Sequence, residues 1–257
     1  MTSAAQLKKE LSPVILVGKG ALAKLSPEDL ASLVDLVKAN QLSSLVLDVE
    51  NKRLVKLKAK VNVAAVTGTA HVRALDALTS LYLQWGKAGL VATFEEGFFD
   101  TLESVEFQAG VIDHIPPGLL LQPALRVLVI HNTAVALPKK VDWPRLEVLR
   151  VGSRGTSMPP CLLLPSLRSL AISAEGSKLE KLPENLGDMQ QLEQLDLSRN
   201  PLTALPESMA KLSRLKHLSL TGTKLEALPA WLADLPSLET LSVDGPLPTA
   251  LQRFARR

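Results

Sequence analysis

The amino-acid sequence predicts an α/β solenoid, in which short parallel strands stack along one side and short helical or extended segments return along the other. Three observations carry this prediction. Aliphatic residues recur in one spacing at nine places, the steps between those places stay within 21 to 25 residues, and a Leu-Pro or Ile-Pro pair recurs at a similar offset. We expect the solenoid to be curved, with its parallel sheet on the concave face and an α/β cap at the N-terminus.

The composition agrees with a chain that buries aliphatic side chains. The 257 residues are 46% hydrophobic and 21% charged, but only 4% aromatic. The 29 basic and 26 acidic side chains nearly balance, so charge alone does not indicate a nucleic-acid or membrane partner. The single cysteine excludes an intramolecular disulfide and any zinc site built from several thiolates. No apolar run has the length of a membrane span, and the basic start lacks the apolar stretch of a Sec signal peptide.

Residues 1–50 do not repeat and are predicted to form the N-terminal cap. The segments 13–17 and 42–48 are typical of strands. Between them, Ser26 is expected to cap a helix, because Pro27 fits the first helical position and two acidic residues follow it. Asn40 is expected to end this helix.

One alternative interpretation of the cap is a dinucleotide site. Residues 18–23 match the pattern G-x-G-x-x-A after a strand, and Asp48 ends the next strand. In such a site the glycines open the helix, whereas here Ser26 begins it several residues later. No second nucleotide-binding half follows, so we expect no cofactor.

Residues 51–245 are predicted to hold about nine repeats, and residues 246–257 a C-terminal cap or tail. In each repeat the second and third aliphatic residues are expected to enter the core from one face of a strand. Asn200 exemplifies a position that favours asparagine, because its side chain can satisfy backbone groups at a tight bend. The following Leu-Pro pair ends the strand and begins the return segment. The repeats start at Leu54, Leu78, Leu102, Leu125, Leu146, Leu167, Leu192, Leu215 and Leu238.

The motif L-x-x-L-x-L-x-x-N-x-L-x-x-L-P-x-x-L-x-x-L is clearest at Leu192–Leu212. It resembles the leucine-rich repeats of bacterial type III effectors from plant pathogens, and the resemblance covers roughly Leu54 to Val243. It implies a non-catalytic scaffold that binds a protein, such as a host protein, on its concave face. It also implies a protein that is made in the bacterial cytoplasm and secreted into the host cell without a Sec signal peptide.

Catalytic chemistry has little support in the sequence. The effector family includes ubiquitin ligases with a catalytic cysteine in a separate C-terminal domain, so an alternative is the substrate-recognition half of such a ligase. Cys161 itself follows Pro160 on a return segment, where we expect a buried and inert thiol. No metal spacing connects the histidines, which are His71, His114, His131 and His217. We therefore predict no catalytic, cofactor-binding or metal-binding residue.

The outward positions of the predicted strands are the candidate binding surface. Three lysines alternate on the first repeat strand, and an aromatic pair, Tyr82 and Trp85, is expected to project beside them. Val127, Val129 and Val148 are expected to add exposed apolar surface. The predicted protein-binding residues are Lys56, Lys58, Lys60, Tyr82, Gln84, Trp85, Glu106, Gln108, Val129, His131, Arg150 and Asp196.

A nucleic-acid partner is the third interpretation. The basic residues that would carry it are Lys52, Arg53, Lys56, Lys58 and Lys60, but the chain lacks the overall basic excess of nucleic-acid-binding proteins. We expect a protein partner and a monomeric chain, with no nucleic acid, membrane or metal bound.

Overall fold

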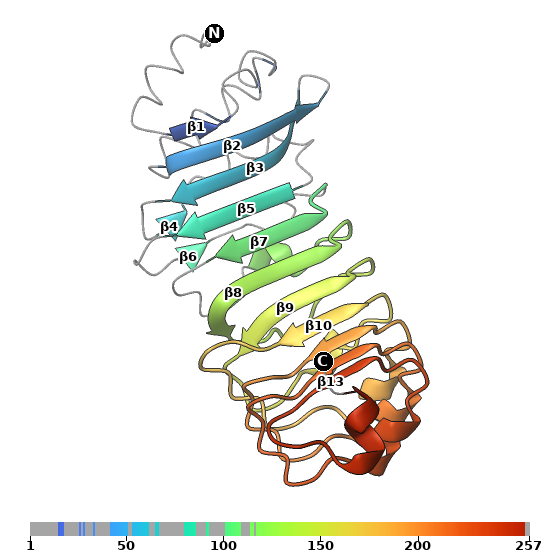
Figure 1. Cartoon of the computed structure of the whole chain (residues 1–257). Coiled ribbons are helices and arrows are strands. Elements are labelled where there is room, and N and C mark those ends of the chain that lie inside the picture. Colours follow the sequence, from blue (N-terminus) through green and yellow to red (C-terminus); the bar gives the residue numbers. More distant parts are fainter. Residues whose placement is uncertain are drawn as a thin grey trace. The chain divides into compact units, whose positions relative to one another are not determined.

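The computed structural model describes residues 15–17, 26, 28, 33, 42–50, 53–61, 65–66, 80–85, 91–92, 101–108, 114–115 and 117–254. The chain divides into two compact units (Figure 1). The first comprises Met1–Ile112 and Pro116–Val127, and the second comprises Asp113–Ile115 and Leu128–Arg257.

Strands of the first unit appear where the sequence predicts them. Their order is β1 (Ile15–Val17), β2 (Leu42–Glu50), β3 (Arg53–Val61), β5 (Ser80–Trp85) and β7 (Ser104–Gln108). A separate parallel pair joins β4 (Ala65–Val66) and β6 (Val91–Ala92).

The predicted helix of the cap is described at two positions. Glu28 and Leu33 are helical, and Leu33 is fully buried. The rest of that helix, the segment 18–23 and the predicted C-terminal tail after residue 254 lie outside the described residues.

One pairing in the first unit differs from the all-parallel sheet that the sequence predicts. Strands β2 and β3 are antiparallel, with Val46 opposite Lys58. Only residues 51 and 52 separate the two strands, and a connection of two residues closes a hairpin, whereas a parallel pair needs a long crossover. The next pairs, β3 with β5 and β5 with β7, are parallel as expected.

The second unit is a run of consecutive parallel strands, each one repeat further along the chain (Figure 1). The strands are β8 (Val127–Val135), β9 (Val148–Ser153), β10 (Ser169–Ile172), β11 (Gln194–Asp196), β12 (His217–Ser219) and β13 (Thr240–Ser242). The predicted repeat spacing is confirmed in the register, because Leu195 lies opposite Leu170 on one side and opposite Leu218 on the other.

Aliphatic side chains from successive repeats fill the core of the second unit. In the repeat of β11, Leu192, Leu195 and Leu197 have exposed fractions of at most 1%. A single repeat cannot enclose these side chains by itself, so each repeat buries them against its neighbours.

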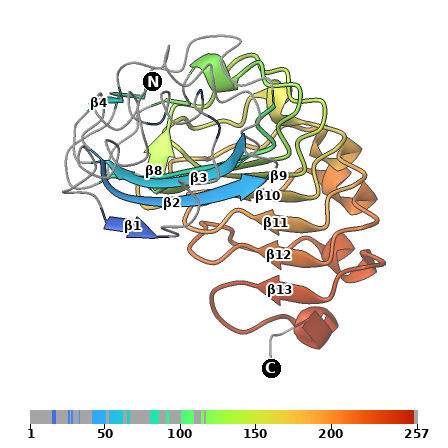
Figure 2. The same ribbon diagram turned by 90° about the horizontal axis from the view of Figure 1, so that it is seen from above.

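The return segments are short 3-10 helices, at places where the Leu-Pro pairs predict short helical or extended segments. Pro206 precedes η6 (Glu207–Lys211) and Pro229 precedes η7 (Ala230–Asp234), in each case with a fixed φ that suits the start of a helical turn. Figure 2 shows these turns gathered along one side of the strands of the second unit. The other turns are η3 (Pro117–Leu119), η4 (Pro160–Leu162), η5 (Leu186–Asp188) and η8 (Thr249–Phe254).

Candidate functional site

The strand face of the second unit is the surface formed by the outward residues of β8–β13. It arises because alternate residues of each strand point away from the core. In β12, for example, Leu218 is buried while His217 and Ser219 on either side of it are partly exposed.

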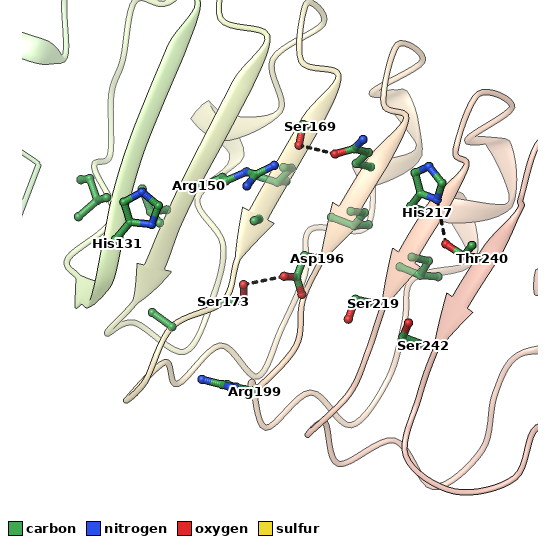
Figure 3. A pocket seen from close by; sticks show the side chains of 18 of the residues that line it. His131, Arg150, Ser169, Ser173, Asp196, Arg199, His217, Ser219, Thr240 and Ser242 are labelled. Carbon is green, nitrogen blue, oxygen red and sulfur yellow. Dashed lines mark hydrogen bonds between the residues drawn. The ribbon is translucent and has the colours of Figure 1, made fainter. Parts of the chain in front are cut away.

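A groove of about 720 Å³ is hollowed into this strand face (Figure 3). Small side chains at in-register positions of neighbouring strands form the floor of the groove. Ala171 lies between Arg150 and Asp196, and Ser219 and Ser242 continue the same row beyond Asp196. Five residues of the lining carry a hydroxyl group, and its large aliphatic residues, such as Leu170, Leu195 and Leu218, are buried.

Hydrogen bonds between neighbouring strands hold the polar floor in place. Ser173 donates from its hydroxyl group to Asp196 Oδ2 at 2.9 Å, and the backbone N–H of Ser198 donates to Asp196 Oδ1 at 2.9 Å. Both oxygens of the Asp196 carboxylate are thus already bound within the protein. One strand further, Nδ1 of His217 lies 2.8 Å from the hydroxyl oxygen of Thr240.

Two arginines that line the groove are not held by hydrogen bonds in this way. Arg150 on β9 and Arg199 after β11 are both exposed, and both line the groove. In the view of Figure 3 the Ser173–Asp196 pair lies between them. Within the described part of the chain, neither guanidinium group forms a hydrogen bond or an ion pair.

Three of the predicted binding residues line this groove, namely His131, Arg150 and Asp196. Val129 is predicted to be exposed, but its exposed fraction is only 8%. Its outward position on β8 therefore does not expose it. Val127 and Val148 are partly exposed.

The predicted residues of the first unit lie in rows across its strands. Lys58 is in register with Tyr82, and Tyr82 with Glu106. The pKa of Tyr82 is raised, first because partial burial disfavours the charged phenolate and second because Glu106 is negatively charged. A second row joins Lys60, Gln84 and Gln108, and Lys56 pairs with Ser80.

Trp85 is the last residue of β5, where its backbone pairs with Val61. The side chain of Trp85 lies outside the described part of the structure, so its exposure beside Tyr82 stays a prediction.

Sequence reasoning missed one column of the groove. Its members precede the mid-strand residues by two positions and so have the same outward parity. The period-two rule that identified Asp196 could have found them as well. They are Ser169, Gln194, His217 and Thr240.

No reactive centre is found among the described residues. Cys161 lies in η4 and is half-buried rather than fully buried, and its Sγ donates to the carbonyl oxygen of Pro138 at 3.1 Å. Burial raises the pKa of this thiol, which disfavours the reactive thiolate. No group of three or more His, Cys, Asp or Glu side chains among the residues searched is placed to hold a metal ion. The helices in the described part include none that is long and apolar enough to cross a membrane.

Comparison with known proteins supports the repeat architecture. Residues 123–252, just over half of the chain, match a family model described as a leucine-rich repeat region. No curated protein sequence matches the chain.

Several solved structures are similar in fold, all at low sequence identity. InlP of Listeria monocytogenes has a TM-score of 0.53 at 19% identity, over 86% of this chain and 64% of InlP. This chain thus spans somewhat less than two thirds of the length of InlP. A leucine-rich repeat protein of Leptospira interrogans has a TM-score of 0.49 at 19% identity, over 90% of this chain and 73% of that one. The leucine-rich repeat domain of the type III effector XopL has a TM-score of 0.46 at 18% identity, over 93% of this chain and 75% of that domain.

Proposed function

Because the chain belongs to the leucine-rich repeat family, whose fold serves as a protein-interaction scaffold, we propose that it recognises a protein partner through the strand face of its second unit. The groove in this face is the observation that carries the proposal.

The dimensions of the groove favour a polypeptide over a small molecule. Its lining runs from Ile130 on β8 to Ser242 on β13. At about 4.8 Å between neighbouring strands, five steps amount to about 24 Å. The groove is open and polar along this length, whereas small-molecule sites are mostly enclosed and apolar.

A matched pair of substitutions tests the proposal. Ala171→Arg places a long charged side chain on the groove floor, and Ala210→Arg makes the same chemical change on the exposed surface of η6. Both variants should keep the melting temperature of the parent protein, since neither position belongs to the buried core. The parent and both variants are then immobilised and used to capture proteins from a eukaryotic cell extract, with identification by mass spectrometry.

We expect Ala171→Arg to lose partners that the parent and Ala210→Arg both retain. If all three proteins capture the same set, recognition does not use the strand face and the proposal is wrong.

We further propose that the partner is a host protein and that the chain acts as a type III effector, or as the recognition half of a ligase effector. The repeat motif at Leu192–Leu212 supports this proposal by its resemblance to effector repeats. A translocation assay with the chain fused to a reporter enzyme, in bacteria with and without a working type III apparatus, tests it. Reporter activity in host cells that does not depend on the apparatus would contradict effector status.

A further inference from the structure

Arg199 occupies a backbone position that the neighbouring repeats give to glycine. Its φ is 60°, and it is the one non-glycine residue with positive φ in the described part of the chain. The equivalent positions, each 23 residues further on, are Gly222 with a φ of 75° and Gly245 with a φ of 77°. The turn after the strand therefore requires the left-handed conformation in three successive repeats.

A residue with a Cβ atom is disfavoured in this conformation, whereas glycine adopts it readily. Arginine at position 199 consequently strains the backbone, and its side chain contributes little to the stability of the fold. The guanidinium group is exposed and has no hydrogen bond or ion pair within the described residues. Sparsely populated backbone conformations of this kind cluster at functional sites.

The charges that line the groove are not equally available to a ligand. Asp196 already accepts hydrogen bonds at both carboxylate oxygens. The guanidinium groups of Arg150 and Arg199 form no hydrogen bond or ion pair within the described part of the chain. The same holds for the carboxylate of Glu175, the other acidic side chain of the lining. The donors to Asp196 are neutral, so the charges of Asp196 and Glu175 balance those of Arg150 and Arg199. The two guanidinium groups are nevertheless the charged donors of the groove that remain available to a ligand.

We propose that the groove binds an extended acidic segment of the partner protein, with carboxylates seated on Arg199 and Arg150. This inference rests on the proposed function of the strand face and adds the chemistry of the partner. Guanidinium groups bind carboxylates in a planar, bidentate geometry, with two parallel N–H···O hydrogen bonds. Arg150 lies within β9 and Arg199 follows β11, so their backbone positions differ by two strands, about 10 Å, and by about three residues along the strand direction. An extended chain spans this distance in about four residues, and residues four positions apart in it share one face. Hydroxyl groups of the floor beyond β11, such as those of Ser219 on β12 and Ser242 on β13, can bond the continuing peptide backbone.

The probe is a fluorescein-labelled peptide with glutamate at every fourth position between serine and glycine, so that successive glutamates share one face of an extended chain. Its twin carries lysine in place of each glutamate. Fluorescence anisotropy at low and moderate salt measures binding of both peptides to the parent protein and to three variants. Arg199→Gly and Arg150→Gln remove the groove arginines, and Lys211→Gln removes one positive charge from the exposed surface of η6 as the control.

We expect the glutamate peptide to bind the parent more tightly than its lysine twin, with affinity falling as salt rises. Arg199→Gly and Arg150→Gln should each weaken the binding about fivefold to tenfold, and Lys211→Gln should leave it unchanged. Arg199→Gly should also raise the melting temperature by about 2–4 °C, because it relieves the left-handed strain. A gain in stability together with a loss in affinity cannot come from damage to the fold.

Three results would overturn the inference: equal or tighter binding of the lysine peptide, full affinity in Arg199→Gly, or a lower melting temperature in that variant. If the acidic peptide fails while Ala171→Arg still abolishes partner capture, only the acidic specificity is wrong. If Ala171→Arg leaves partner capture unchanged, the strand face itself is not the recognition surface.

Discussion

Asn200 shows how a single side chain completes a repeat. It is fully buried, and its Nδ2 donates to the carbonyl oxygens of Leu197 at 3.0 Å and Ser198 at 3.2 Å, and also to that of Ile172 in the preceding repeat. Its Oδ1 accepts from the backbone N–H of Leu179 at 3.1 Å. Buried backbone groups at the bend are thus satisfied within the protein, as the asparagine position of the motif predicts.

The inward and outward positions of β11 should differ sharply in stability. Leu195→Ala removes a side chain that is 1% exposed between two regular repeats, and should lower the free energy of unfolding by about 2–5 kcal/mol. Ser198→Ala, at a partly exposed position just after the strand, should lower it by less than about 0.5 kcal/mol. Urea unfolding followed by circular dichroism measures both, and equal midpoints for the two variants would refute the assignment of faces.

At the scale of the strands, charge alternates from one repeat to the next in the second unit. The residue after the first leucine of these repeats lies beside its equivalents in the stack, where opposite charges attract. Glu193 illustrates the pattern, because its carboxylate contacts Lys216 Nζ at 2.8 Å and Arg168 Nη1 at 2.9 Å. The alternating residues of the second unit are Glu147, Arg168, Glu193, Lys216 and Glu239.

This ion pairing predicts an acid-dependent loss of stability. Hydrogen bonds from Lys216 and Arg168 hold the pKa of Glu193 below its ordinary value. Glu193 therefore stabilises the folded state above the ordinary glutamate pKa, and this contribution disappears as the pH falls through the lowered pKa. Glu193→Gln should show a smaller drop in melting temperature than the parent when the pH is lowered from about 7 to about 3. The difference should be small because the pair is solvent-screened, and identical pH profiles would exclude the linkage.

The register of β5 predicts opposite consequences for its two aromatic residues. Tyr82→Ala changes a partly exposed outward position and should leave the melting temperature within about 2 °C of the parent. Trp85 is three positions after Tyr82, so the strand period predicts that it points to the opposite face, and Trp85→Ala should lower the melting temperature by several degrees. Differential scanning fluorimetry compares the two variants. A stable Trp85→Ala protein would restore the sequence-based placement of Trp85 on the outward side.

At the scale of the whole molecule, stability is the sum of contacts between neighbouring repeats, and a terminal repeat has a neighbour on one side only. The turn η8 covers the last repeat of the second unit, next to η7, and buries Leu251 and Phe254. We propose that this turn caps the leucines of that repeat, as the sequence predicts for residues 246–257.

Removal of this cap should destabilise the second unit. A chain that ends at Pro248 loses Leu251 and Phe254 and exposes the apolar surface beneath them, so its melting temperature should fall and its tendency to aggregate should rise. A chain that ends at Phe254 serves as the control. Thermal unfolding and light scattering measure both effects, and a fully stable chain ending at Pro248 would show that η8 is dispensable.

The repeat pattern by itself was sufficient to predict the strands, their parallel stacking in the second unit, the buried leucines and the places of the return segments after Pro206 and Pro229. These features depend on local spacing, because a period of two defines the faces of a strand and a proline ends it. The same rule predicts opposite faces for Tyr82 and Trp85, which are three positions apart in β5, so the predicted aromatic pair does not follow from the spacing.

The tertiary structure alone decided how much of each outward side chain remains accessible. Val129 and Arg150 are both outward by period, yet Val129 is 8% exposed whereas Arg150 is an exposed residue, so the strand period alone does not determine exposure. The groove likewise depends on which small residues come into register across β9–β13, and the engagement of Asp196 depends on Ser173 from the adjacent repeat. Spacing along the chain determines which way a residue points, whereas contacts between repeats determine what it can bind.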